Sequence, residues 1–400
     1  MGQTRGRSAL VPPQPPSYFG HVRTGDTAII DRRGLDELIT ALGQRGFRTL
    51  GPIVRDGAIV HGEVGASSDL PVGWHDEQGP GSYRLRSGDE GTLFDWAVGP
   101  ASWKSEFFPP QETIWRATVG EGEVSIDEPA PEPAPVAIVG ARPCELAALD
   151  ILDRVLKDGE VPDPGYARRR QGSFVVVVEC GSPSASCFCT SMGTGPSATE
   201  GFDLALTELT APGDHRFLVR VGSEAGAELL DATSWRIPAP HDLDQRDAVV
   251  ADSSTRMGRS LDTDGLAALL ARNLDHPQWE KVADRCLSCG NCTLVCPTCF
   301  CSDVDDVSDL SGSVERQRSW ASCFDLAHSY IHGGPVRPTT SSCYRQWLTH
   351  KLSTWWDQFD SSGCVGCGRC VTWCPVGIDI TEEAAAIRAT DGSTDGGRRE

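Results

Sequence analysis

The sequence predicts an α/β module with a parallel sheet, followed by a mostly α-helical domain. Two apolar runs at 136–139 and 173–179 have the length of buried strands, and an amphipathic helical pattern at 145–156 lies between them. This order of strand, helix and strand is typical of a right-handed βαβ unit, in which the two strands are parallel. After about residue 260 the apolar spacing becomes helical, and two copies of one cysteine motif follow.

Further strands and helices are expected around this unit. A short strand at 28–30 and an amphipathic helix at 33–44 precede it. Two more strand patterns, at 49–54 and 58–64, are joined by Asp56-Gly57, a dipeptide that favours a tight hairpin. Strands at 217–221 and 248–251 are expected to extend the sheet, and helices are expected at 261–273, 278–285, 320–332 and 344–359.

Composition and charge exclude several classes of function. The 400 residues carry a net charge of −20, which repels nucleic acid and anionic membrane surfaces. No apolar run reaches the roughly 18 to 20 residues that cross a bilayer, and the amino terminus lacks the apolar segment of a secretory signal. We therefore expect a cytoplasmic protein. In a reducing compartment, 16 cysteines at short spacings indicate metal binding rather than disulfides.

One cysteine motif occurs twice, as C-L-S-C-G-N-C-T-L-V-C-P at 286–297 and as C-V-G-C-G-R-C-V-T-W-C-P at 364–375. In C-x2-C-x2-C-x3-C-P, three thiolates of one tight loop bind one [4Fe–4S] cluster and the fourth cysteine binds the other cluster. Zinc knuckles and ribbons use paired cysteines instead. The repeat therefore predicts a ferredoxin domain with two [4Fe–4S] clusters. The first is expected on Cys286, Cys289, Cys292 and Cys374, and the second on Cys364, Cys367, Cys370 and Cys296.

A second group of cysteines follows the strands of the βαβ unit. Cys144 follows the first strand, Cys180 follows the second, and Cys187 and Cys189 lie in the loop after it. Because the carboxyl ends of neighbouring parallel strands share one edge of a sheet, these four thiols should lie close together. A third [4Fe–4S] cluster, a zinc ion and buried unligated thiols remain open for them. The other cysteines are either ligands of a further cluster or free thiols that pack as small apolar side chains. They are Cys299, Cys301, Cys323 and Cys343.

Motifs for other chemistry are absent from the sequence. No G-x-G-x-x-G follows a strand, and neither a G-x4-G-K-[ST] phosphate loop nor an H-E-x-x-H motif occurs. We therefore expect electron transfer and no catalytic residues. The expected domains are a flexible tail at 1–27, the α/β domain with the possible third site at 28–260, the α-helical ferredoxin domain at 261–385 and a disordered tail at 386–400.

Several short sequence segments, beyond the cysteine spacing itself, make this chain distinctive. They are G-P-I-V-R-D-G-A-I-V at 51–60, D-L-P-V-G-W at 69–74, G-S-Y-R-L at 81–85, S-W-K-S-E-F-F-P-P at 102–110, G-A-R-P-C-E at 140–145, C-F-C-T-S-M-G-T-G-P at 187–196, C-P-T-C-F-C at 296–301 and H-K-L at 350–352. With these blocks the chain resembles the β (iron–sulfur) subunit of soluble NADP-linked [NiFe] hydrogenases of the sulfhydrogenase type. It is also similar to the iron–sulfur electron-transfer subunit of anaerobic sulfite reductase. In one block the chain has Glu145 after Cys144, where the family pattern has an aspartate.

The resemblance implies an electron-transfer subunit of an oxidoreductase complex. Its partners would be a FAD- and NAD(P)-binding diaphorase subunit and the small and large subunits of a [NiFe] hydrogenase. Two other interpretations remain open. In one, the chain feeds the sirohaem subunits of an anaerobic sulfite reductase; in the other, it is a flavin-binding iron–sulfur oxidoreductase in its own right. Neither nucleic acid nor a membrane is an expected partner.

Overall fold

The computed structural model describes residues 20–88, 91–120, 123–127, 134–211, 213–310 and 312–391. Much of the two predicted tails, residues 1–19 and 392–400, lies outside the described residues. Within the described part, Val22 is buried and helix α14 (Ile380–Ala389) continues past residue 385, where the ferredoxin domain was expected to end. No helix among the described residues is long and apolar enough to cross a membrane.

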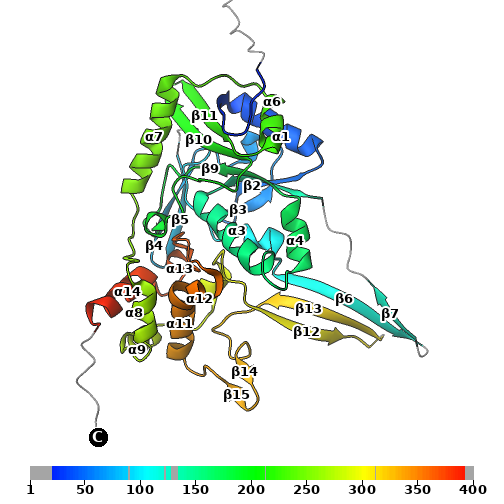
Figure 1. Cartoon of the computed structure of the whole chain (residues 1–400), viewed down its shortest axis with the longest axis vertical. Coiled ribbons are helices and arrows are strands. Elements are labelled where there is room, and N and C mark those ends of the chain that lie inside the picture. The colour runs from blue at the N-terminus through cyan, green and yellow to red at the C-terminus, as the bar shows by residue number, and fades with distance from the viewer. Residues whose placement is uncertain are drawn as a thin grey trace, which may run out of the picture.

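A seven-stranded sheet forms the amino-terminal module (Figure 1). Its central strands are parallel, because β8 pairs in parallel with β2 and β9, and β9 pairs in parallel with β10. Every residue of β8 and β9 is buried, which explains their unbroken apolar runs. The predicted parallel βαβ unit is confirmed, within a sheet whose outer pairings are antiparallel. The strand order is β1 (Thr27–Asp31), β11 (Asp214–Val221), β10 (Leu204–Ala211), β9 (Phe174–Val178), β8 (Val136–Ala141), β2 (Arg48–Arg55) and β3 (Ala58–Glu63).

Helices cover both faces of this sheet. On one face, α1 (Arg32–Gln44) and α6 (Glu224–Asp231) bury their leucines against the central strands in one apolar core. On the other face, α3 (Pro143–Leu156) and α4 (Pro164–Gln171) form a second core with the opposite side chains of the same strands. The sheet is therefore the middle layer of three.

The strand expected at 248–251 is wrong, because these residues lie in helix α7 (Pro240–Thr255). Pro240 occupies the first turn of this helix, where a missing N–H costs nothing. The carboxylate of Asp242 accepts a hydrogen bond from the amide of Ala239 at 2.8 Å and so fixes the helix start. Val249 then packs against Leu209 and Leu218 of the sheet. The prediction failed because the short apolar run at 248–251, which lies inside this capped helix, resembles a strand pattern.

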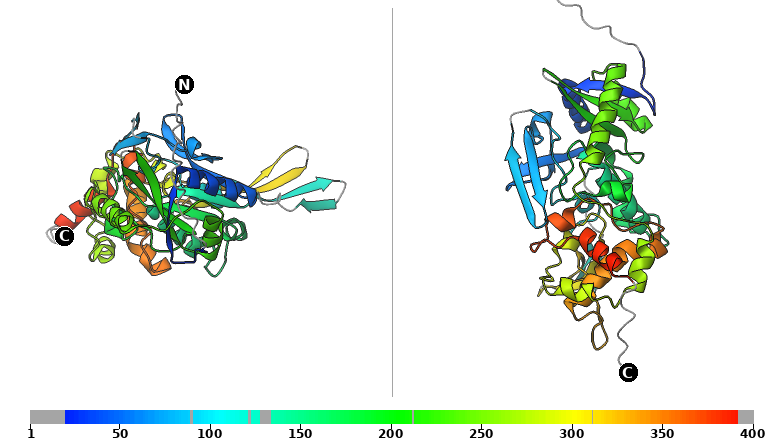
Figure 2. Two further views of the ribbon diagram at one scale, coloured as in Figure 1. Left: turned by 90° about the horizontal axis from the view of Figure 1, so that it is seen from above. Right: turned by 90° about the vertical axis from the view of Figure 1, so that its left-hand side faces the viewer.

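A second sheet combines two distant parts of the chain and projects from the body as a ribbon (Figures 1 and 2). Its order is β12 (Ser302–Ser308), β13 (Ser313–Trp320), β6 (Gln111–Gly120) and β7 (Glu123–Asp127), and all pairings are antiparallel. Because β6 pairs with β13, the ribbon joins the α/β module to the segment between the cysteine motifs.

The helix expected at 320–332 is also wrong. After β13 ends, the chain turns and forms a two-stranded pair of β14 (Tyr330–Ile331) and β15 (Gly334–Pro335). Ser322 accepts a hydrogen bond from the amide of Phe324 at 3.2 Å, and Asp325 accepts one from the amide of Ala327 at 3.0 Å. Such local bonds from serine and aspartate side chains favour turns over helix.

The carboxy-terminal part packs short helices around an apolar core of its own. Helix α11 (Thr340–Thr349), a π-helical turn η2 (His350–Thr354) and α12 (Trp355–Phe359) form the expected continuous helical stretch between the motifs. With β12 and β13 inserted, this part mixes helices and strands. Its other helices are α8 (Leu266–Arg272), α9 (Gln278–Ala283), α10 (Asn291–Leu294) and α13 (Arg369–Thr372).

A β-hairpin bridges the two parts on the other side of the molecule. It consists of β4 (Trp74–Gly79) and β5 (Ser82–Ser87), in a region where the sequence has no clear periodicity. At the hairpin turn, Gly81 N donates to Val371 O at 3.1 Å. The Tyr83 ring lies 5.0 Å from the ring of Trp373. The α/β module therefore contacts the second cysteine loop directly.

Candidate iron–sulfur centres

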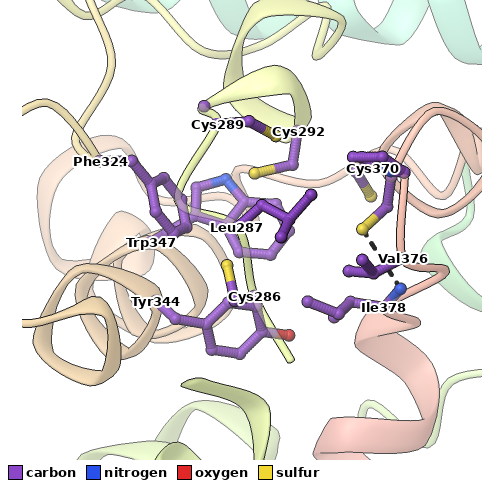
Figure 3. A pocket seen from close by; sticks show the side chains of 13 residues that line it. Cys286, Leu287, Cys289, Cys292, Phe324, Tyr344, Trp347, Cys370, Val376 and Ile378 are labelled. Carbon is purple, nitrogen blue, oxygen red and sulfur yellow. Dashed lines mark hydrogen bonds between the residues drawn. The ribbon is translucent and has the colours of Figure 1, made fainter. Parts of the chain in front are cut away.

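The first cysteine loop lines a pocket that also receives residues of the second motif (Figure 3). Cys286 and Cys289 border the pocket from the segment that leads into α10, Cys292 borders it from α10 itself, and Cys374 of the second motif reaches the same pocket. The structure thus brings together all four residues expected on the first cluster, including the exchanged cysteine. Cys370 also borders this pocket, so the two expected sites adjoin here. The wall is formed by Leu287, Phe324, Tyr344, Trp347, Val376 and Ile378.

The second group forms where Cys296 of the first motif meets the cysteines of the other motif. The thiols of Cys364, Cys367 and Cys296 all lie near enough to Cys370 to influence its ionisation. Burial is the largest cause that raises the pKa of Cys370, and burial also raises the pKa of Cys364 to about 12. Burial thus keeps Cys364 and Cys370 protonated unless a metal binds them. The pKa of Cys296 is instead lowered, by its hydrogen bond with Cys299 and by the nearby Lys351 ammonium group.

Backbone amides point at the sulfurs of both groups. Gly366 N donates to Cys364 Sγ at 3.4 Å, and Ile378 N donates to Cys374 Sγ at 3.3 Å (dashed line in Figure 3). Amide donors stabilise cluster thiolates and influence the reduction potential. Gly366 has a φ of 66°, a left-handed conformation that glycine adopts without strain. The cysteines supply the thiolate ligands that a [4Fe–4S] cluster requires, and the amides add hydrogen bonds that influence its potential.

The third group lies at the carboxyl ends of β8 and β9. Cys144 is in the first turn of α3, Cys180 follows β9, and Cys187 and Cys189 lie in the loop that leads into α5 (Cys189–Met192). All four are buried. The ionisation of Cys189 is influenced by Cys187 and Cys180, and that of Cys144 by Cys189. The structure therefore brings the four thiols together at the predicted sheet edge. Burial raises the pKa of Cys187 to about 12.

The loops that carry the second and third groups interlock. Phe188 N donates to Gly366 O at 2.8 Å. A Cβ on Gly366 would lie 2.6 Å from Phe188 O, and a Cβ on Gly368 would lie 2.5 Å from Ser186 O, so only glycine fits at either position. Cys367 is consequently close enough to influence the ionisation of both Cys144 and Cys189. The second and third groups are neighbours.

Among the described residues, no group of three or more His, Cys, Asp or Glu side chains is arranged to hold a single metal ion.

Comparisons with known proteins bear directly on these sites. Residues 285–378 match the 4Fe-4S dicluster domain family. Over 254 residues the chain is 36% identical to sulfhydrogenase 2 subunit beta of Pyrococcus furiosus, and the match covers 63% of this chain and 73% of that protein. The chain belongs to the sulfhydrogenase beta-subunit family. It binds two [4Fe–4S] clusters, and the resemblance to a hydrogenase iron–sulfur subunit is confirmed.

This member of the sulfhydrogenase beta-subunit family has a buried ion pair between the second and third groups. Arg369 Nη2 lies 2.5 Å from Glu145 Oε1, and their side chains are 1% and 4% exposed. Glu145 also accepts hydrogen bonds from Trp103 Nε1 at 3.2 Å and from Arg142 N at 3.0 Å. The ring of His61 stacks on Trp103 with 3.5 Å between centroids. Glu145, next to Cys144 of the third group, is therefore joined to Arg369 in the second cysteine loop.

The remaining cysteines of this sulfhydrogenase-type protein fall into three places. Cys299 hydrogen-bonds Cys296 and is thus beside the second group. Cys301 and Cys323 hydrogen-bond each other at the base of the projecting ribbon. Cys343 has its Sγ 3.4 Å from Arg337 O and is close enough to Cys286 of the first group to influence its ionisation. Whether any of them binds a metal stays a prediction.

Two buried lysines lie near the second group, and no sequence motif predicts this position for them. Lys104 and Lys351 are 2% and 3% exposed. Lys351 Nζ donates to Cys296 Sγ at 3.2 Å, and Lys104 Nζ donates to Cys299 O at 3.0 Å. The chain has only four lysines, and these two lie in distinctive sequence blocks. Their rarity and their position in those blocks are the only signals that the sequence offers.

Proposed function

We propose that this protein relays electrons through three [4Fe–4S] clusters, between a flavin-bearing NAD(P)H diaphorase subunit and a [NiFe] hydrogenase module. The observation that carries the proposal is the order of the three cysteine groups. Cys370 borders the pocket of the first group, and Cys367 adjoins the third. Each cluster accepts and releases one electron, so adjoining clusters form a path without acid or base catalysis.

In this proposal each motif supplies three ligands to its own cluster and one to the other. Cys286, Cys289, Cys292 and Cys374 hold the first cluster, and Cys296, Cys364, Cys367 and Cys370 hold the second. Support comes from the convergence of each set on one place and from the amide donors to Cys364 and Cys374. The exchange fixes the two clusters side by side.

Cys144, Cys180, Cys187 and Cys189 hold the third cluster in this proposal. Four buried thiols at one sheet edge, beside a cluster loop, support a cofactor there rather than packing alone. Thiols that only pack as small apolar side chains would not have to lie next to one another. The two ends of the relay are then the third cluster in the α/β module and the first cluster, where Cys289 is exposed.

The partners are inferred from the relative's name, which is that of a sulfhydrogenase subunit. Purification of the complex from the native cell tests them. Co-purification of nickel-containing and flavin-containing subunits is expected. A sirohaem protein in their place would contradict the hydrogenase assignment, and flavin bound to the isolated chain would contradict a pure relay.

Iron and acid-labile sulfide analysis of the anaerobically purified chain tests the number of clusters. Three clusters predict about twelve iron atoms per chain, and two predict about eight. The double variant Cys187→Ala/Cys189→Ala should lose about four irons. Cys343→Ala is the matched control, because Cys343 is also buried but is not one of the twelve cysteines assigned to the three clusters. Equal iron content in the double variant and the wild type would refute the third cluster.

A further inference from the structure

Lys351 is a buried ammonium group that is bonded to a cluster sulfur. Its Nζ donates to Cys296 Sγ at 3.2 Å, to Thr298 Oγ1 at 3.1 Å and to Gly363 O at 2.9 Å. None of these acceptors is a carboxylate. Because an isolated charge is costly to bury, the sulfur is the group that can compensate this cation.

The local fold holds this side chain in place. Lys351 lies in the π-helical turn η2, a wider helical turn that often occurs at functional positions. Its carbonyl accepts a hydrogen bond from Gly363 N at 2.8 Å, immediately before Cys364. Its Nζ lies 5.7 Å from the centroid of the buried Trp355 ring. The helix and the second cysteine loop thus fix the ammonium group from both sides.

The first cluster site has a different electrostatic environment. The residues that line its pocket are cysteines, a glycine, a proline and apolar or aromatic side chains, and no lysine or arginine is among them. At the second site, Arg369 is neutralised by Glu145, whereas the charge of Lys351 faces sulfur. The second site therefore has buried positive charge beside it, that of Lys351 at a ligand sulfur and that of Lys104 at the Cys299 carbonyl, which the lining of the first site lacks.

We propose that Lys351 raises the reduction potential of the cluster on Cys296, Cys364, Cys367 and Cys370 and makes it the electron-holding station in the middle of the relay. This inference rests on the ligand assignment proposed above. One electron enters the cluster, and no bond forms or breaks. The reduced cluster carries one more negative charge than the oxidised cluster, so a fixed cation beside a ligand sulfur stabilises the reduced state more.

Redox titration of the cluster-loaded chain, followed by electron paramagnetic resonance, tests this role. In Lys351→Met, the potential of one cluster should become more negative, with at least a tenfold loss in electron affinity, which corresponds to 59 mV for a one-electron couple. Lys351→Arg keeps the charge and should retain most of the wild-type potential. Lys281→Met removes the same charge from an exposed position in α9 and should shift no potential, because solvent screens that charge.

The outcomes separate the inference from the proposed function. Unchanged potentials in Lys351→Met overturn the inference. Loss of about four irons in that variant also overturns it, because Lys351 would then serve assembly rather than potential. Cys367→Ser identifies the signal of the second cluster, and the signal altered in this variant should be the one that Lys351→Met shifts. If Cys367→Ser alters no signal, the ligand assignment itself is wrong.

Discussion

Glu145→Gln is expected to lower the free energy of unfolding by about 3 to 5 kcal/mol, because it leaves a buried guanidinium without its counter-charge. The carboxylate of Glu145 accepts bonds from Arg369, Trp103 and the Arg142 amide, and its side chain is only 4% exposed. Glutamine preserves the shape and removes the charge. Arg369 keeps its bonds to two carbonyls, of Gly99 at 2.8 Å and Ala101 at 2.7 Å, which do not neutralise it.

Helix α3 offers a matched control for this variant. Asp150 pairs with Arg154 one turn apart, but these side chains are 63% and 45% exposed. Asp150→Asn should therefore cost only about 0.3 to 0.5 kcal/mol. Anaerobic urea unfolding of the cluster-loaded chains, followed by tryptophan fluorescence and cluster absorbance, measures both. Equal midpoints for the two variants would refute the role given to the buried pair.

The pH dependence gives the same prediction a second test. Burial acts to raise the pKa of Glu145, but Arg369, His61 and the Arg142 amide outweigh it and hold this pKa below its ordinary value. A depressed carboxyl pKa contributes stability that is complete above the unfolded pKa and is lost as the pH falls through the folded pKa. The destabilisation by Glu145→Gln should therefore be largest near neutral pH and shrink under acid conditions.

Two further predictions follow from neighbouring residues. Burial lowers the pKa of His61 from 6.5 to about 4. The free energy of unfolding should therefore fall by about 3 kcal/mol as the pH drops between these two values. His61→Phe should remove that loss, which unfolding experiments across this pH range would measure. Gly366→Ala should release iron from the second and third sites, because the new Cβ would meet Phe188 O at 2.6 Å. Gly193→Ala is its control, with a similar φ of 68° but no atom within 4 Å, and iron loss equal in both variants would contradict the steric argument.

Motif spacing and the order of strands and helices predicted most of the candidate site from the sequence. The C-x3-C-P spacing led to the expectation that Cys374 joins Cys286, and the structure brings both to one pocket. Parallel strands share an edge, so Cys144 and Cys180 could be expected together, although they belong to separate strand ends. Both arguments need only the local motif or the order of strand and helix.

Contacts between distant segments lay beyond such rules. Glu145 and Arg369 are 224 positions apart, and no periodicity links them. Lys351, in the π-helical turn η2, bonds Cys296 from 55 positions away. The strand expected at 248–251 and the helix expected at 320–332 failed for a related reason. Capping and turn-forming side chains outside the apolar pattern decided both segments.

The projecting ribbon has a consequence for any attempt to divide this protein. Its middle strands, β6 and β13, come from the two halves of the chain and pair with each other. A cut near residue 260 would therefore leave each half with a strand whose row of amide and carbonyl groups has lost its partner. Unpaired strand edges recruit other chains and promote aggregation. The two halves should stay in solution when they are expressed together and aggregate when they are expressed separately. They therefore cannot be exchanged between proteins as independent modules.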